Sequence, residues 1–99
     1  MRLTLPQTLA IRRIVLEAAG ADARVRVFGS RLDDHARGGD LDLLLELTEP
    51  AANAALLAAR VSARVSRVLH GRKVDVVVSA PNLMRLPIHD IAQREGQLL

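Results

Sequence analysis

The stretch from Gly39 to Leu47, GDLDLLLEL, decides the fold of this chain. Side chains alternate between the two faces of a β-strand, so the leucines at positions 41, 43, 45 and 47 share one face, and the opposite face begins with Asp40 and Asp42. This pattern predicts a strand in which one face is entirely leucine. The two carboxylates lie roughly 6–7 Å apart along the backbone, and they disfavour each other's ionisation unless a cation lies between them.

The composition predicts one folded domain over residues 1–99. The chain is 49% hydrophobic and 25% charged, which is typical of a globular protein and not of a disordered one. It has no cysteine, which excludes disulfides and thiolate zinc sites. No apolar run reaches the roughly 20 residues of a membrane helix, and the first residues lack a signal-peptide pattern. We therefore expect a cytoplasmic protein without membrane contact.

The charge is basic, with a net charge of +3 and an isoelectric point near 11. This balance permits anionic partners without requiring them. Phe28 is the only aromatic residue, so the stacking platforms of single-strand nucleic-acid binders are missing. Direct binding of nucleic acid is not expected.

The rest of the chain predicts two more strands and three helices. ARVRVFGS (23–30) and KVDVVVS (73–79) alternate like half-buried strands. Helices are expected from the capping box of Thr4 and Gln7 to Gly20, from Pro50 to Leu69, and from Pro87 to Glu95. The expected fold is α/β (α+β), with a small mixed sheet of about three strands flanked by helices. Leu98 and Leu99 are expected to be a frayed tail or part of an interface.

Acidic and small residues at the strand ends predict a site for phosphate chemistry. Asp75 is a third carboxylate in a valine-rich strand, and strands of a small sheet usually lie side by side. Oxygen ligands of this kind select Mg²⁺, and three carboxylates can hold the two ions used in phosphoryl or nucleotidyl transfer. Gly29 and Ser30 can offer backbone N–H groups to a phosphate, and Arg31 can add a bidentate contact.

Each feature alone also has a plain structural explanation. An Asp-x-Asp pair is commonly an exposed strand face, and Ser30 can simply cap a short helix. The arginines at 60, 64 and 67 are expected to form a solvated helix face rather than a surface for a partner or RNA. The histidines at 35, 70 and 89 have no metal-ligand spacing and are expected at loops or helix ends. A catalytic site is favoured only by the combination of three features: Gly-Ser after one strand, Asp-x-Asp at the start of the next, and an aspartate within a third.

This combination resembles a known family. VFGSRLDDHARGGDLDLLLEL followed by KVDVVV is similar, over roughly residues 24–79, to the minimal nucleotidyltransferase (MNT) family of the DNA polymerase beta-like superfamily. The resemblance implies a polymerase beta palm-like fold. It also implies roles for two sets of residues. The metal-binding and catalytic set is Asp40, Asp42 and Asp75, and the set that holds the nucleoside triphosphate is Gly29 and Ser30, with Arg31 matched less directly.

The resemblance further implies the reaction and a partner. An acceptor hydroxyl would attack the α-phosphorus of ATP or another NTP with two Mg²⁺ ions bound, and Asp75 would be the candidate general base. The loop RLDDHARGG is one residue shorter than is common in the family, so the roles of Arg31 and Arg37 stay open. Larger relatives carry an added helical domain for the acceptor. A chain of this length has no room for that domain, so the acceptor is expected from elsewhere.

Three functions follow from the resemblance. The first is protein adenylylation by the antitoxin of a toxin–antitoxin module, in which the partner is a helical HEPN protein. The second is a binding module that regulates its partner by contact without catalysis. The third is nucleotidylation of a small molecule such as an aminoglycoside.

Overall fold

The computed structural model describes residues 3–29 and 41–99. These residues form a four-stranded sheet with the order β3-β2-β1-β4, and three helices. The elements in chain order are α1 (Leu5–Ala19), β1 (Arg24–Phe28), β2 (Leu41–Glu46), α2 (Ala54–Val68), β3 (Val74–Ser79), α3 (Pro87–Glu95) and β4 (Gln97–Leu98). β1 is antiparallel to both β2 and β4, whereas β2 and β3 are parallel. The predicted mixed sheet flanked by helices is therefore confirmed.

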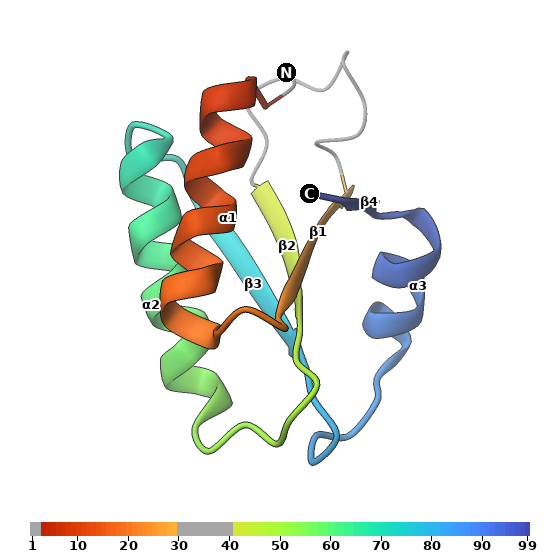
Figure 1. The fold of residues 1–99 in the computed structure, drawn as a ribbon. Coiled ribbons are helices and arrows are strands. Elements are labelled where there is room, and N and C mark those ends of the chain that lie inside the picture. Colours follow the sequence, from red (N-terminus) through yellow and green to blue (C-terminus); the bar gives the residue numbers. More distant parts are fainter. Residues whose placement is uncertain (1–2, 30–40) are drawn as a thin grey trace.

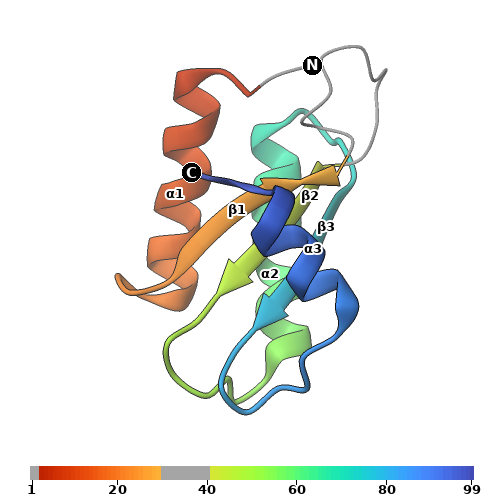
Figure 2. The ribbon, with the colours of Figure 1, turned by 90° about the vertical axis from the view of Figure 1, so that its right-hand side faces the viewer.

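The helices lie in two layers on opposite faces of the sheet. α1 and α2 lie side by side on one face, and α3 lies on the other (Figures 1 and 2). In the part of the chain that the structure describes, no helix is long and apolar enough to cross a membrane.

The strand β2 is central to the core because it is buried on both faces. Leu41, Leu43 and Leu45 are fully buried beneath α1 and α2. Leu44 points to the opposite face, where it packs with Phe28 of β1 and Ala92 of α3. Burial of a leucine side chain contributes about 1.5–3 kcal/mol, so this one strand supplies a large share of the apolar free energy of folding.

The start of α1 agrees with the capping-box prediction. The Gln7 N–H donates to Thr4 Oγ1 (3.2 Å), and the Thr4 N–H donates to Gln7 Oε1 (2.9 Å). Pro6 lies in the first turn, where its missing N–H would have no helical partner. The bounds of α3 also match the prediction.

One predicted helix start was wrong, and the sheet has one strand more than the three expected. α2 begins at Ala54 and not at Pro50, because the Asn53 side chain caps it by accepting the Leu56 N–H (3.0 Å). The residues before this cap form a loop, which Asn82 holds through two hydrogen bonds to the backbone of Ala51 (2.8 and 2.9 Å). The sheet also has a fourth strand, β4, whose Leu98 lies in register with Arg26 of β1 and is not frayed.

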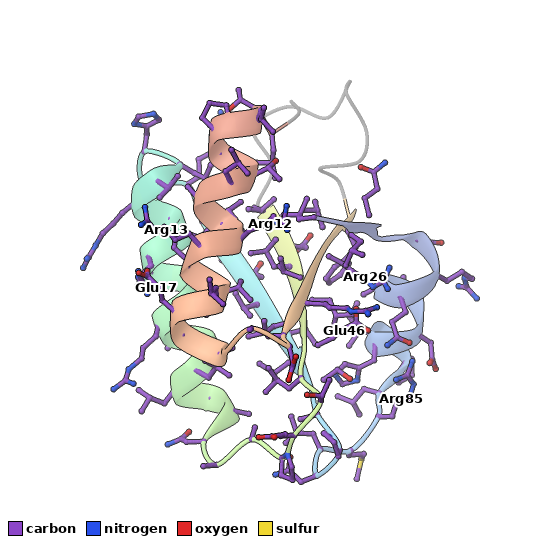
Figure 3. The ribbon with its side chains drawn as sticks, in the orientation of Figure 1. Arg12, Arg13, Glu17, Arg26, Glu46 and Arg85 are labelled. Atoms are coloured by element: carbon purple, nitrogen blue, oxygen red, sulfur yellow. The ribbon has the colours of Figure 1, made fainter. Side chains whose placement is uncertain are left out.

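A polar network joins α3 to the sheet. Glu46 of β2 accepts hydrogen bonds from Arg26 Nε (2.5 Å) and from Gln93 Nε2 of α3 (2.9 Å). Arg85 donates to Gln93 and to Asp90 Oδ1 (2.7 Å). Figure 3 shows Arg26, Glu46 and Arg85 on the side of the sheet that α3 covers. The side chains of Arg26 and Glu46 are only 23% and 21% exposed, so this pair is screened less than a surface ion pair.

His89 is the buried polar residue of the described core. It is at the start of α3, as predicted for a helix-end histidine, and it is 4% exposed. Its Nδ1 accepts the Leu86 N–H (2.8 Å), so Nε2 carries the proton and donates to the Val78 carbonyl of β3 (3.0 Å). Both ring nitrogens are therefore satisfied within the fold.

Candidate active site

The site is built around two carboxylates that the sheet places side by side. Asp42 of β2 and Asp75 of β3 are direct partners in the parallel register. They alternate with the residues packed against α1 and α2, so both point to the opposite face, the one that α3 partly covers. Neighbouring strands lie about 4.8 Å apart. The sequence prediction that these two side chains share a face therefore agrees with the structure.

Gly29 is held directly against one of these carboxylates. It follows β1, whose last residue, Phe28, pairs with Asp42 in the antiparallel register. Its φ is +75°, a backbone conformation that favours glycine, and a Cβ at this position would lie 2.4 Å from Asp42 Oδ2. The backbone of Gly29 can approach Asp42 only because it has no side chain. The glycine of the Gly-Ser motif thus has a physical reason in the structure that is separate from any contact with a phosphate.

A cation of the chain lies near the second carboxylate. Lys73 Nζ is 4.0 Å from Asp75 Oδ1, and the two side chains are 69% and 48% exposed. Exposed pairs of this kind contribute at most about 1 kcal/mol. The exchange of Lys73 for another cation at Asp75 would therefore cost little, and the Asp75 side chain stays accessible from solvent.

The donor set fits a hard divalent cation. Asp42 and Asp75 offer only oxygen atoms, on adjacent strands whose positions are fixed by the buried core. Such donors suit Mg²⁺, whereas zinc sites use histidine and cysteine. Within residues 3–29 and 41–99, no group of three His, Cys, Asp or Glu residues is placed to hold a metal. The third predicted ligand, Asp40, lies outside the described residues.

Several other predicted site residues are also outside the described residues. Ser30 and Arg31, predicted at the triphosphate, are among them, as are His35 and Arg37. The structure thus brings together Gly29, Asp42 and Asp75 and does not describe the rest.

Glu46 shares the strand face of Asp42 but belongs to another part of the molecule. Four residues of an extended strand separate the two carboxylates by about 13 Å. Glu46 is held by Arg26 and Gln93, as described above, and it anchors α3. The sequence pattern gave no sign of this role, because both partners are distant along the chain.

The sheet presents paired carboxylates on two adjacent strands, next to the glycine that follows a third strand. This arrangement is suited to transfer chemistry on phosphates. The comparison with family models agrees with this description. The model of the nucleotidyltransferase domain matches residues 10–98, so the chain belongs to this family. No curated protein matches the chain in a sequence search. Membership indicates a transferase that uses a nucleoside triphosphate.

Proposed function

We propose that this nucleotidyltransferase-domain protein transfers AMP from ATP to a hydroxyl group of a partner protein, and that it acts as the antitoxin of a HEPN/MNT module. The family supplies the reaction class. The observation that carries the proposal is the direct pairing of Asp42 with Asp75, with Gly29 against Asp42. All three described helices lie in layers against the sheet, so none of them forms a separate lobe for an acceptor (Figure 1). In the proposed reaction, the partner protein carries the acceptor hydroxyl.

In this proposal, different residues bind the metal, the nucleotide and the acceptor. Asp42 and Asp75, together with Asp40, would hold Mg²⁺, and Gly29, Ser30 and Arg31 would hold the triphosphate. When bound, Mg²⁺ supplies charge neutralisation at the phosphate oxygens and favours deprotonation of the acceptor hydroxyl.

Asp75 is suited to a further task because its side chain is half-exposed and open to an arriving acceptor. It would take the proton of the acceptor hydroxyl. The hydroxyl oxygen then forms a bond to the α-phosphorus, and the bond from that phosphorus to the bridging oxygen breaks. Pyrophosphate leaves with the electron pair. The products are the adenylylated acceptor, pyrophosphate and one proton.

The test is transfer of label from ATP to a candidate acceptor. The protein is incubated with Mg²⁺, ATP labelled on the α-phosphate and the product of the neighbouring reading frame, and the partner is analysed by intact mass. We expect the partner to gain one AMP, and Asp42→Asn to abolish the gain. Asp22→Asn is the matched control, because Asp22 is exposed in the turn after α1, far along the chain from the carboxylate pair.

Other outcomes discriminate between the functions. If wild type and Asp42→Asn neutralise the partner equally and neither modifies it, the protein is a binding module and the proposal is wrong. Label that appears on an aminoglycoside and not on protein would instead establish the small-molecule reaction.

A further inference from the structure

Helix α1 has two apolar faces, of which the sheet and α2 cover only one. Its inner face carries Ile11, Ile14 and Val15, all buried. Three leucines, at positions 5, 9 and 16, are 71%, 52% and 53% exposed. A helix on the surface of a globular protein normally presents polar residues outward. The fold itself therefore does not account for these leucines.

The exposed leucines form a continuous stripe with a charged residue inside it. Positions 5, 9, 12 and 16 are spaced by four, three and four residues, which is the spacing of the contact positions in a coiled coil. Arg12 occupies one of these positions and Arg13 lies beside it, and both side chains are exposed. Figure 3 labels both arginines on α1. We call this set (Leu5, Leu9, Arg12, Arg13 and Leu16) the outer stripe.

The outer stripe borders a groove of about 730 Å³ between α1, the start of β1 and the C-terminal strand. Arg24 and the half-exposed Leu98 add a further cation and a further apolar side chain to its lining. Among the described residues that line this groove, none is an aspartate or a glutamate. Within the described part of the chain, Arg12, Arg13 and Arg24 form no ion pair, whereas Glu17 of the same helix is paired with Arg64 of α2 (2.5 Å).

We propose that the outer stripe and this groove bind an acidic amphipathic helix of a partner protein. Leucine-type side chains of that helix would pack between the exposed leucines, and its carboxylates would meet the unpaired guanidinium groups. Carboxylates close to Arg12 and Arg13 would fix the register of the two helices.

Two other occupants fit the observations less well. A second copy of the chain would bring Arg12 and Arg13 of both copies into one seam without an acidic residue, and like charges oppose association. RNA would meet the arginines but gain nothing from the leucines. It would also find no stacking platform, because Phe28 is the only aromatic residue and is 6% exposed.

The proposal goes beyond the proposed transfer reaction, because docking on α1 needs neither Asp42 nor Asp75. The two surfaces are nevertheless related in space. Figure 1 shows that α1 begins at the end of the molecule where β2 also begins, which is the end that carries the carboxylate pair. A helix bound along α1 would thus reach that end of the molecule.

The test uses designed helical peptides as probes. One fluorescent peptide of about 20 residues, long enough to form a stable helix, carries leucines at heptad spacing with flanking glutamates. Its matched partner carries lysines in place of the glutamates. Fluorescence anisotropy with the full chain should show binding of the glutamate peptide, weaker binding at high salt, and no comparable binding of the lysine peptide.

Two variants separate the apolar and the charged contributions. Leu9→Ser/Leu16→Ser and Arg12→Glu/Arg13→Glu should each weaken binding of the glutamate peptide by about tenfold or more. The second variant should gain affinity for the lysine peptide, which a merely unfolded variant would not do. Arg60→Glu/Arg67→Glu, a charge reversal on the exposed face of α2, is the matched control and should leave binding within about twofold of wild type.

The proposal is overturned if neither peptide binds, or if the α2 control weakens binding as much as the α1 variants do. It is equally overturned if sedimentation shows a dimer that Leu9→Ser/Leu16→Ser dissociates, or if a single-stranded RNA binds through Arg12 and Arg13 without the leucines. Failure of the transfer reaction gives a different result: Asp42→Asn would still bind the peptide. Conversely, the leucine variant would still bind Mg²⁺ and ATP.

Discussion

Replacement of Gly29 by alanine should destabilise the fold and disturb Asp42 at the same time. The φ of +75° costs a residue with a Cβ about 1–2 kcal/mol. The new Cβ would also lie 2.4 Å from Asp42 Oδ2, so that carboxylate has to turn away. A side chain forced from its preferred rotamer costs about 0.5–1.5 kcal/mol. The expected total is about 1.5–3.5 kcal/mol, the sum of these two terms.

The chain offers a matched control for the backbone term. Gly71 has a similar φ of +85°, but a Cβ there would meet nothing within 4 Å. Gly71→Ala should therefore lose only the conformational part, about 1–2 kcal/mol. The collision term should also vanish when Gly29→Ala is combined with Asp42→Ala, because the remaining contact, from the Cβ of residue 42, is 3.5 Å.

The assay is urea and thermal unfolding of Gly29→Ala, Gly71→Ala, Asp42→Ala and the Gly29→Ala/Asp42→Ala double variant, followed by titration with Mg²⁺ and ATP. For a domain of this size, 1 kcal/mol lowers Tm by about 4–8 °C. We expect a coupling free energy of about 0.5–1.5 kcal/mol between Gly29→Ala and Asp42→Ala. We also expect Gly29→Ala, but not Gly71→Ala, to weaken Mg²⁺·ATP binding. Equal effects of the two glycine variants in both measurements would refute the argument that Gly29 and Asp42 constrain each other.

Two further predictions concern the α3 side of the sheet. Glu46→Ala should lower the free energy of unfolding by about 1–3 kcal/mol, because it leaves a half-buried guanidinium and an amide without their acceptor. Glu17→Ala, which removes an exposed ion pair, should lower it by less than about 1 kcal/mol. Equal urea midpoints for these two variants would contradict the role of Glu46 as an anchor of α3. His89→Leu should lower the free energy of unfolding by about 1–3 kcal/mol, because it leaves the Val78 carbonyl without its donor. Amide hydrogen exchange should then be faster in α3 than in α1, and uniform protection would show that the imidazole does not anchor this helix.

The sheet could be predicted from the sequence because its signals are local. Alternation of valine and arginine identified β1, and the leucine run with its two aspartates identified β2. β4 could not be predicted in the same way. It is two residues long, and it exists as a strand only through its pairing with Arg26 and Val27, which are distant along the chain. A periodicity cannot be recognised in two residues.

The start of α2 shows the same limit. Pro50 fits the first turn of a helix, which is why the sequence favours a helix from that point. The structure instead uses Asn53 as the cap, and Asn82 holds the preceding loop in place. The contact made by Asn82 spans 31 residues, so no local pattern could indicate it.

The strand faces of Asp42 and Asp75 could be predicted from the sequence, but their direct pairing could not. A period of two residues places Asp42 on the face opposite Leu41, Leu43 and Leu45, and the valines at positions 74, 76 and 78 indicate the same for Asp75 in β3. That the two carboxylates are direct neighbours depends on the register of the parallel pair, which one sequence does not determine. The contact of Gly29 with Asp42 depends on that geometry as well.

The double burial of β2 ties the carboxylate pair to the integrity of the whole domain. A shift of this strand by one residue would turn Asp42 into the hydrophobic core and Leu41 and Leu43 out of it. The loss of folding free energy would exceed the stability of a small domain. The register of β2 therefore fixes Asp42 and Asp75 in the same relative position before a ligand binds. Regulation of this carboxylate pair is therefore expected to act on the access of metal, nucleotide or acceptor rather than on the register of the two strands.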